Sequence, residues 1–153
     1  MGGRRIICVG NRYVPRDAAG PHVLEHLARC ELPEGVELID GGLAGLDLLR
    51  FVDGAERVVF VDALDTEDQA AGVQVTSPAE LSGAAPPAYG HGAGLAYLLA
   101  VLPEVCDRPL PPVHVVGVAG PAGARVIRDA ADTALRLVQQ SAPAARRSSP
   151  GCG

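Results

Sequence analysis

The chain has 153 residues, of which 48% are hydrophobic and 20% charged. These proportions are typical of one folded domain and exclude an intrinsically disordered protein. Eighteen acidic residues oppose thirteen basic ones, and the sequence has no basic patch of the kind that binds a phosphate backbone. We therefore expect a globular protein that does not bind nucleic acid.

No apolar stretch of the sequence approaches the length of a membrane span. Arg4 and Arg5 stand near the start, but the apolar run that follows, residues 6–9, is too short for the hydrophobic region of an export signal. The cysteines form no Cys-x-x-Cys pair, so we expect reduced, structural thiols. These features predict a cytoplasmic protein without a membrane partner, and we also expect a monomer.

Predicted strands alternate with predicted helices along most of the chain. Apolar runs indicate strands at residues 5–9, 36–39, 58–61 and 113–118, and the alternation of Val73-Gln74-Val75 indicates a half-exposed edge strand. Helices are indicated by apolar residues at helical spacing. These residues are Val23, Leu24, Leu27 and Ala28; Leu43, Leu46, Leu49 and Val52; Leu95, Leu98, Leu99 and Leu102; and Val126, Ile127, Ala130, Ala134, Leu137 and Val138.

This order of elements predicts a three-layer α/β/α sandwich with a mainly parallel, roughly five-stranded sheet. The edge strand at residues 73–75 follows the third strand without an intervening helix, so we expect it to be antiparallel. Residues 1–140 make the single predicted domain. Residues 141–153 consist of Ser, Pro, Ala, Arg, Gly and Cys, and predict a disordered tail.

Three acidic residues follow strands of this predicted sheet. Asp17 lies in the loop after the first strand, Asp40 follows the second before the expected tight turn Gly41-Gly42, and Asp62 ends the third. Right-handed crossovers bring these loops to one edge of the sheet, where open α/β sheets bind ligands. The alternative is a structural role: Asp17 would complement a helix dipole and Asp62 would cap or solvate a loop.

Two of these carboxylates and one imidazole suggest a metal site. Asp17, Asp62 and His91 would make a three-ligand site for zinc, nickel or iron that leaves coordination positions open. No short motif such as His-Glu-x-x-His supports it, so the spacing alone leaves a structural role open. His22 and His26 could also hold a metal, although an exposed helix face accommodates two histidines without a function. No covalent nucleophile is predicted.

Four segments resemble the nickel-iron hydrogenase maturation endopeptidases. The first is Ile7-Cys8-Val9-Gly10-Asn11 followed by Asp17-Ala18-Ala19-Gly20-Pro21-His22-Val23, and the second is Ile39-Asp40-Gly41-Gly42 with Gly45 and Leu48-Leu49. The third is Val58 to Ala63, and the fourth is His91 with Gly94-Leu95 and Leu98-Leu99. The likeness covers roughly residues 5 to 140, in order and with compatible spacing.

The resemblance implies an α/β sandwich that removes the C-terminal extension of a hydrogenase large-subunit precursor after nickel insertion. The family's metal-site positions fall on Asp17, Asp62 and His91, and the resemblance implies that the substrate supplies the nickel. It implies no organic cofactor. Asn11 and the Asp40-Gly41-Gly42 turn match positions near the site and are the predicted substrate-binding residues.

Three residues depart from the family's pattern. Arg16 stands where the family usually has the first of two acids, Leu43 where it has Thr, and Ala71 where it has Pro. Two other functions stay open: a zinc-type metallohydrolase on the same site, and a nucleotide-binding module. The latter would use the strand, Gly10-Asn11 and helix at the start, although the Gly-x-Gly-x-x-Gly turn is missing.

Overall fold

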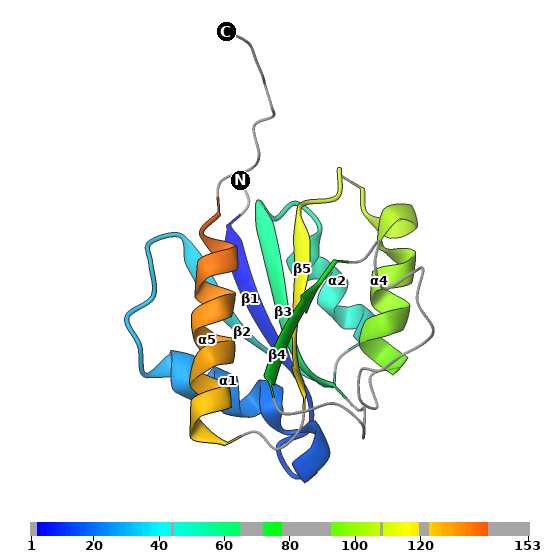
Figure 1. Ribbon diagram of the computed structural model, residues 1–153. Helices are drawn as coiled ribbons and strands as arrows, with labels where there is room; N and C mark the ends of the chain where they lie inside the picture. The colour runs from blue at the N-terminus through cyan, green and yellow to red at the C-terminus, as the bar shows by residue number, and fades with distance from the viewer. Residues whose placement is uncertain are drawn as a thin grey trace, which may run out of the picture.

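The computed structural model describes residues 3–43, 45–64, 72–77, 93–107, 109–119 and 123–140. These residues form one sheet with helices on both faces (Figure 1). The strands are β1 (Arg4–Val9), β2 (Val36–Gly42), β3 (Arg57–Leu64), β4 (Gly72–Thr76) and β5 (Val113–Ala119). The helices are α1 (Ala19–Ala28), α2 (Leu49–Val52), α4 (Ala93–Val105) and α5 (Ala124–Val138), with short 3-10 turns η1 (Pro15–Asp17) and η2 (Gly45–Leu48).

The sheet has the strand order β2-β1-β3-β5-β4. β1 pairs in parallel with β2 and with β3, β3 pairs in parallel with β5, and β4 pairs antiparallel with β5. The predicted fold class is therefore confirmed, including the antiparallel edge strand. The ends of β1 and β3 lie side by side, and this places the loops that follow them at one edge of the sheet.

Two apolar cores lie on opposite faces of the sheet. α1 and α5 cover one face, and α2 and α4 cover the other (Figure 1). β3 is buried along its whole length, as expected of a central strand with helices on both sides. Val59, Val61 and Ala63 belong to the core under α1 and α5, whereas Phe60 and Leu64 belong to the other core. Strand alternation therefore places Asp62 on the side of α2 and α4.

Two strands run further than their apolar runs predicted. β3 continues through Asp62 to Leu64, because Asp62 pairs with Gly117 of β5 and the pairing continues for two more residues. Asp62 is therefore part of the strand and does not begin a loop. β2 likewise includes Asp40 and ends at Gly42, which has a φ of 51°, so the predicted tight turn at Gly41-Gly42 is instead the last part of a strand.

The predicted second helix is shorter than its leucine spacing indicated. Among the described residues of the range 43–52, which leave out residue 44, only Leu49–Val52 are α-helical, after the 3-10 turn η2. Leu43 directly follows the extended β2 and is 70% exposed, so its side chain does not join the core. In α1, the predicted inward residue Ala28 is also exposed, whereas Val23 and Leu27 are fully buried.

Some predictions lie outside the described residues. They include the tail at residues 141–153, the loop at residues 82–89 and the burial of Leu95. Among the helices in the described ranges, none has the length and apolar character needed to cross a membrane.

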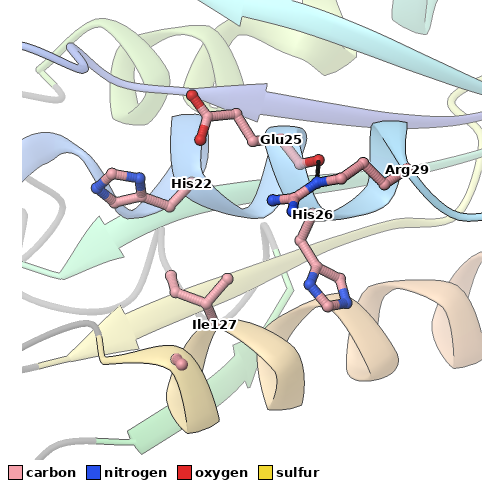
Figure 2. Close-up of a pocket in the computed structure, with 6 residues that line it drawn as sticks. His22, Glu25, His26, Arg29 and Ile127 are labelled. Carbon is pink, nitrogen blue, oxygen red and sulfur yellow. Dashed lines mark hydrogen bonds between the residues drawn. The ribbon is translucent and has the colours of Figure 1, made fainter.

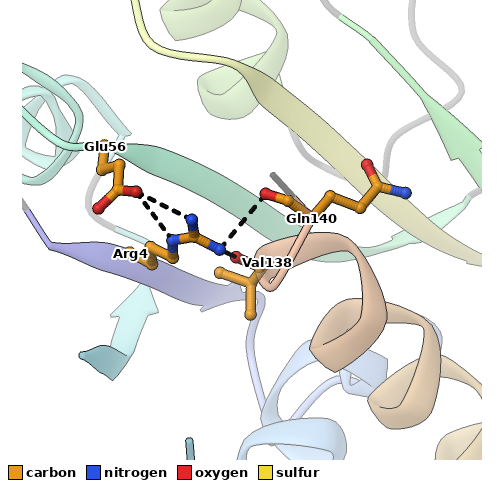
Figure 3. A network of polar contacts seen from close by, with 4 residues as sticks. All are labelled: Arg4, Glu56, Val138 and Gln140. Carbon is orange, nitrogen blue, oxygen red and sulfur yellow. Dashed lines mark hydrogen bonds and ion pairs between the residues drawn. The ribbon is translucent and has the colours of Figure 1, made fainter. Parts of the chain in front are cut away.

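Arg4 connects the start of β1 with the end of α5 (Figure 3). Its Nη1 atom donates hydrogen bonds to the carbonyl oxygens of Val138, at 3.0 Å, and Gln140, at 3.3 Å. Its Nε and Nη2 atoms donate to Oε2 of Glu56, at 3.1 and 2.9 Å. The guanidinium thus satisfies carbonyl groups that lack partners within the helix, and it places a positive charge at the negative end of the helix dipole.

We expect Arg4→Ala to lower the free energy of unfolding by about 1–2 kcal/mol, because it removes the hydrogen bonds to the end of α5 as well as an ion pair. Glu56→Ala removes only the solvent-exposed ion pair and should cost less than about 1 kcal/mol. Urea unfolding of both variants and the wild type measures the difference. Equal losses in the two variants would show that the contact with α5 contributes nothing.

Candidate functional site

The loop after β1 is closed on itself by Asp17. The backbone N–H of Asn11 donates both to the carbonyl oxygen of Asp17 and to its Oδ2 atom, each at 3.0 Å. The N–H of Tyr13 donates to Oδ1 of Asn11 at 2.9 Å. Gly10 makes this closure possible, since its φ is 134° and a Cβ atom there would lie 2.3 Å from the carbonyl oxygen of Asp17.

Gly20 lets α1 begin directly over the ends of β1 and β3. A Cβ atom at this position would lie 1.9 Å from the carbonyl oxygen of Val9 and 3.0 Å from that of Val61. No side chain fits at such distances, so the first turn of α1 contacts the two strand ends through its backbone. This contact brings Asp17, two residues before α1, to the end of β3 that carries Asp62.

Asp17 and Asp62 are both buried, with 4% and 2% of their surfaces exposed. Burial raises the pKa of Asp62 to about 8, an N–H bond from Ala63 to Oδ1 at 2.8 Å acts in the opposite direction, and the charge of Asp17 raises the pKa further. The two carboxyl groups are therefore close enough to interact. At neutral pH, Asp62 is mostly protonated.

Two interacting buried carboxyl groups have a clear chemical preference. They cannot both ionise at low cost unless a positive charge lies beside them. A proton meets this need in the structure as described, and a divalent cation would meet it while replacing that proton. The donor set fits a metal that accepts carboxylate oxygen, and it also fits proton transfer to or from a bound group.

The predicted substrate-binding residues lie on the adjoining strand end. Gly10 N donates to the carbonyl oxygen of Gly42 at 2.9 Å, which fastens the end of β2 to the loop that holds Asn11. Gly41 is buried against side chains of β1, and Oδ1 of the exposed Asp40 accepts a hydrogen bond from Gly42 N at 3.1 Å. Asp40 thus stands at the same edge, but its charge is not among the causes of the raised pKa of Asp62.

His91 lies outside the described residues, so its place in the site remains a prediction. In the ranges that the structure does describe, no three His, Cys, Asp or Glu side chains are grouped so that they could hold a metal ion. The structure therefore brings together Asp17 and Asp62. Arg16 is exposed beside the buried Asp17 and does not contribute to the shifted pKa of Asp62.

Gly117 is a site residue that the sequence analysis missed. It pairs with Asp62 across β3 and β5, and a Cβ atom there would lie 2.8 Å from Cγ of Leu64. The absence of a side chain lets Leu64 fill the space next to the buried carboxyl group. The sequence did contain a signal for this position, because Gly117 interrupts the apolar run at residues 113–118. A glycine inside a strand often marks a close approach of neighbouring atoms.

We expect Gly20→Ala to destabilise the protein by at least about 2 kcal/mol, because the new methyl group forces α1 away from the strand ends. Gly72→Ala is the matched control, since a Cβ atom there meets nothing within 4 Å. Urea unfolding measures both. A Gly20→Ala protein as stable as the control would refute the close contact between α1 and the strands.

The raised pKa of Asp62 predicts that the free energy of unfolding depends on pH. Between an ordinary carboxyl pKa of about 3.9 and the folded value of about 8, the folded chain binds a proton here and the unfolded chain does not. Stability from this group therefore falls as pH rises, by at most about 1.4 kcal/mol per pH unit, and levels off above pH 8.

Asp62→Asn removes this titration, so its stability relative to wild type should increase between pH 5 and pH 8. Urea unfolding at each pH, in the presence of a chelator, measures the difference between the two proteins. The other titrating groups are common to both and cancel. Parallel stability profiles would contradict the buried, protonated state of Asp62.

Comparison with known proteins places this chain in a family. The family model for HycI, hydrogenase maturation protease, matches residues 21–122. The hydrogenase 2 maturation protease of Escherichia coli K12 is 32% identical over 71 residues, 46% of this chain and 43% of the relative. The hydrogenase expression/formation protein HupD of Rhodobacter capsulatus is 36% identical over 61 residues, 39% of this chain and 29% of the relative. The matched stretches thus span less than half the length of these relatives.

Solved structures agree over a larger part of the chain. The hydrogenase maturating endopeptidase HybD from Escherichia coli superposes with a TM-score of 0.70 and 25% identity, and the match covers 88% of this chain and 91% of that protein. HybD from Thermococcus kodakarensis has the same fold, with a TM-score of 0.64, 20% identity, and coverage of 88% and 95%. Because the family model matches more than half of the sequence, the chain belongs to the hydrogenase maturation protease family.

Proposed function

We propose that the protein is an endopeptidase that removes the C-terminal extension of a nickel-iron hydrogenase large-subunit precursor after nickel has been inserted. Family membership supports the reaction class and the type of substrate. The observation that carries the proposal is the pair of buried, interacting carboxyl groups, Asp17 and Asp62, at the edge where β1 and β3 end. We place the reaction in the cytoplasm and expect the enzyme to act as a monomer.

In this proposal the nickel belongs to the substrate. Asp17, Asp62 and His91 are the residues that would bind it, and a dication beside the two carboxyl groups would favour their ionised forms. The free enzyme keeps Asp62 mostly protonated at neutral pH, so capturing free nickel requires the loss of that proton. Thiolate ligands on the precursor would supply the remaining coordination that a late transition metal prefers.

The surface beside the carboxyl pair has features that suit a polypeptide substrate. Asn11, Asp40, Gly41 and Gly42 lie on the joined ends of β1 and β2, and we propose that they contact the precursor. Two large apolar side chains near them are turned to solvent: Tyr13 is 86% exposed and Leu43 is 70% exposed. Exposed apolar groups next to a polar site favour contact with another protein chain.

The requirement for both metal and peptide would make the reaction selective. Neither the enzyme's incomplete ligand set nor a short peptide contact binds tightly alone, whereas the nickel-loaded precursor supplies both interactions at once. Other proteins would offer only one of these interactions, so they would bind more weakly than the nickel-loaded precursor, which offers both. A zinc-type metallohydrolase on the same residues would instead hold its own metal before the substrate arrives.

We expect Asp17→Ala, Asp62→Ala and His91→Ala each to slow precursor processing by at least about 100-fold, since each removes a proposed contact with the nickel. Asp132→Ala, at an exposed position of α5, is the control and should process normally. Mass spectrometry of the precursor measures cleavage, and circular dichroism checks folding. Full activity in a folded variant would remove that residue from the site.

The same assay with nickel-free precursor tests the role of the metal. Wild-type enzyme should leave that precursor uncut, because the second of the two required interactions is missing. Elemental analysis of the purified enzyme accompanies the assay. Efficient cleavage without nickel, together with stoichiometric bound zinc, would replace this proposal with the metallohydrolase.

A further inference from the structure

A groove of about 280 Å³ separates α1 from the start of α5 (Figure 2). It lies on the face of the sheet covered by α1 and α5, whereas strand alternation places Asp62 on the opposite side. The groove is therefore distinct from the carboxyl pair. Its lining residues are His22, Glu25, His26, Arg29, Ala124 and Ile127.

Two histidines stand one helical turn apart at this groove. His22 and His26 are four residues apart on α1, so their side chains share one face of the helix. His22 is exposed, and His26 is half-buried with its imidazole lying toward α5 (Figure 2). Neither imidazole forms a hydrogen bond or an ion pair with another described residue. No polar contact therefore holds either ring, and four-residue spacing on a helix allows both to bind a common ligand.

The neighbouring charged groups make polar contacts of their own. The Glu25 carboxylate points away from α5 (Figure 2) and pairs with Nη1 of Arg12 at 3.6 Å. Arg29 donates from Nε to the carbonyl oxygen of Glu25 at 3.3 Å. The two residues that α5 contributes, Ala124 and Ile127, carry no charge. The groove thus offers two imidazoles as its uncommitted ligands, and it has no carboxylate aimed into it.

We propose that His22 and His26 form a two-imidazole chelate for a late first-row divalent cation, Ni²⁺, Cu²⁺ or Zn²⁺, with water completing its coordination. Imidazole nitrogen suits these ions, whereas Mg²⁺ and Ca²⁺ prefer oxygen ligands. Two ligands hold such an ion more weakly than a closed four-ligand site does, so the bound ion stays exchangeable. The helix fixes the spacing of the two rings, so the folded chain binds the ion more tightly than the unfolded chain and is stabilised by it.

Calorimetric titration of the full-length, untagged protein with Ni²⁺ tests this site. The Asp62→Asn background removes a ligand of the other proposed metal site and isolates the groove. In that background, His22→Ala and His26→Ala should each weaken binding at least tenfold, and nickel should no longer raise the melting temperature. Glu25→Gln is the matched control on the same helix, and its affinity should stay within about twofold of the background protein.

Copper provides a spectroscopic signature. Electron paramagnetic resonance of the Cu²⁺-loaded protein should show nitrogen coupling from two imidazoles, and each histidine substitution should reduce it to one. Unchanged nickel affinity in both histidine variants would overturn the proposal. So would loss of all binding in Asp62→Asn alone, which would assign the metal to the carboxyl pair. Precursor cleavage is not part of this test, so the proposed protease activity stands or falls separately.

Discussion

The structure depends on how two carboxyl groups are kept buried at the end of a parallel sheet. Asp62 belongs to a strand with no exposed residue, and Asp17 is brought beside it by a loop that closes on its own carboxylate. Ionising both groups there is costly unless a proton or a cation compensates their charge. The raised pKa of Asp62 expresses that cost. A structural cap would need no such burial, so the arrangement favours a site that receives a positively charged ligand.

The backbone, more than the side chains, builds this arrangement. Gly10 lets the loop reach Asp17, Gly20 lets α1 contact the ends of β1 and β3, and Gly117 leaves room for Leu64 next to Asp62. Each position has a neighbouring atom within 3.0 Å of where a Cβ would stand. Glycine in a helix or strand lowers stability, because it loses more conformational entropy on folding than other residues do. Here the close backbone contacts that glycine permits bring the two carboxyl groups together.

The sequence predicted the layers and the edge of the sheet more reliably than the ends of its elements. Apolar runs and the alternation at residues 73–75 are local patterns, and the fold follows from them through general rules of chain connection. The end of β3 is not a local property. Asp62 looks like a strand terminator until its pairing with Gly117 is known, because a charged residue is not expected inside a buried strand. The leucines at residues 43–52 misled for a similar reason, since Leu43 lies in the turn that directly follows β2 and is exposed.

The position of Asp62 also bears on how the free protein would avoid binding stray metal at the carboxyl pair. At neutral pH, a proton and an incoming cation compete for a carboxyl group whose pKa is about 8. The incoming ion must therefore displace that proton. The two imidazoles on α1 line an open groove, and neither forms a hydrogen bond or an ion pair with another described residue. If the proposed chelate forms, free nickel can bind in the groove without entering the buried carboxyl pair. Under the proposed function, the buried pair responds to nickel that arrives with additional binding energy from a protein substrate, which is the condition that a maturation checkpoint requires.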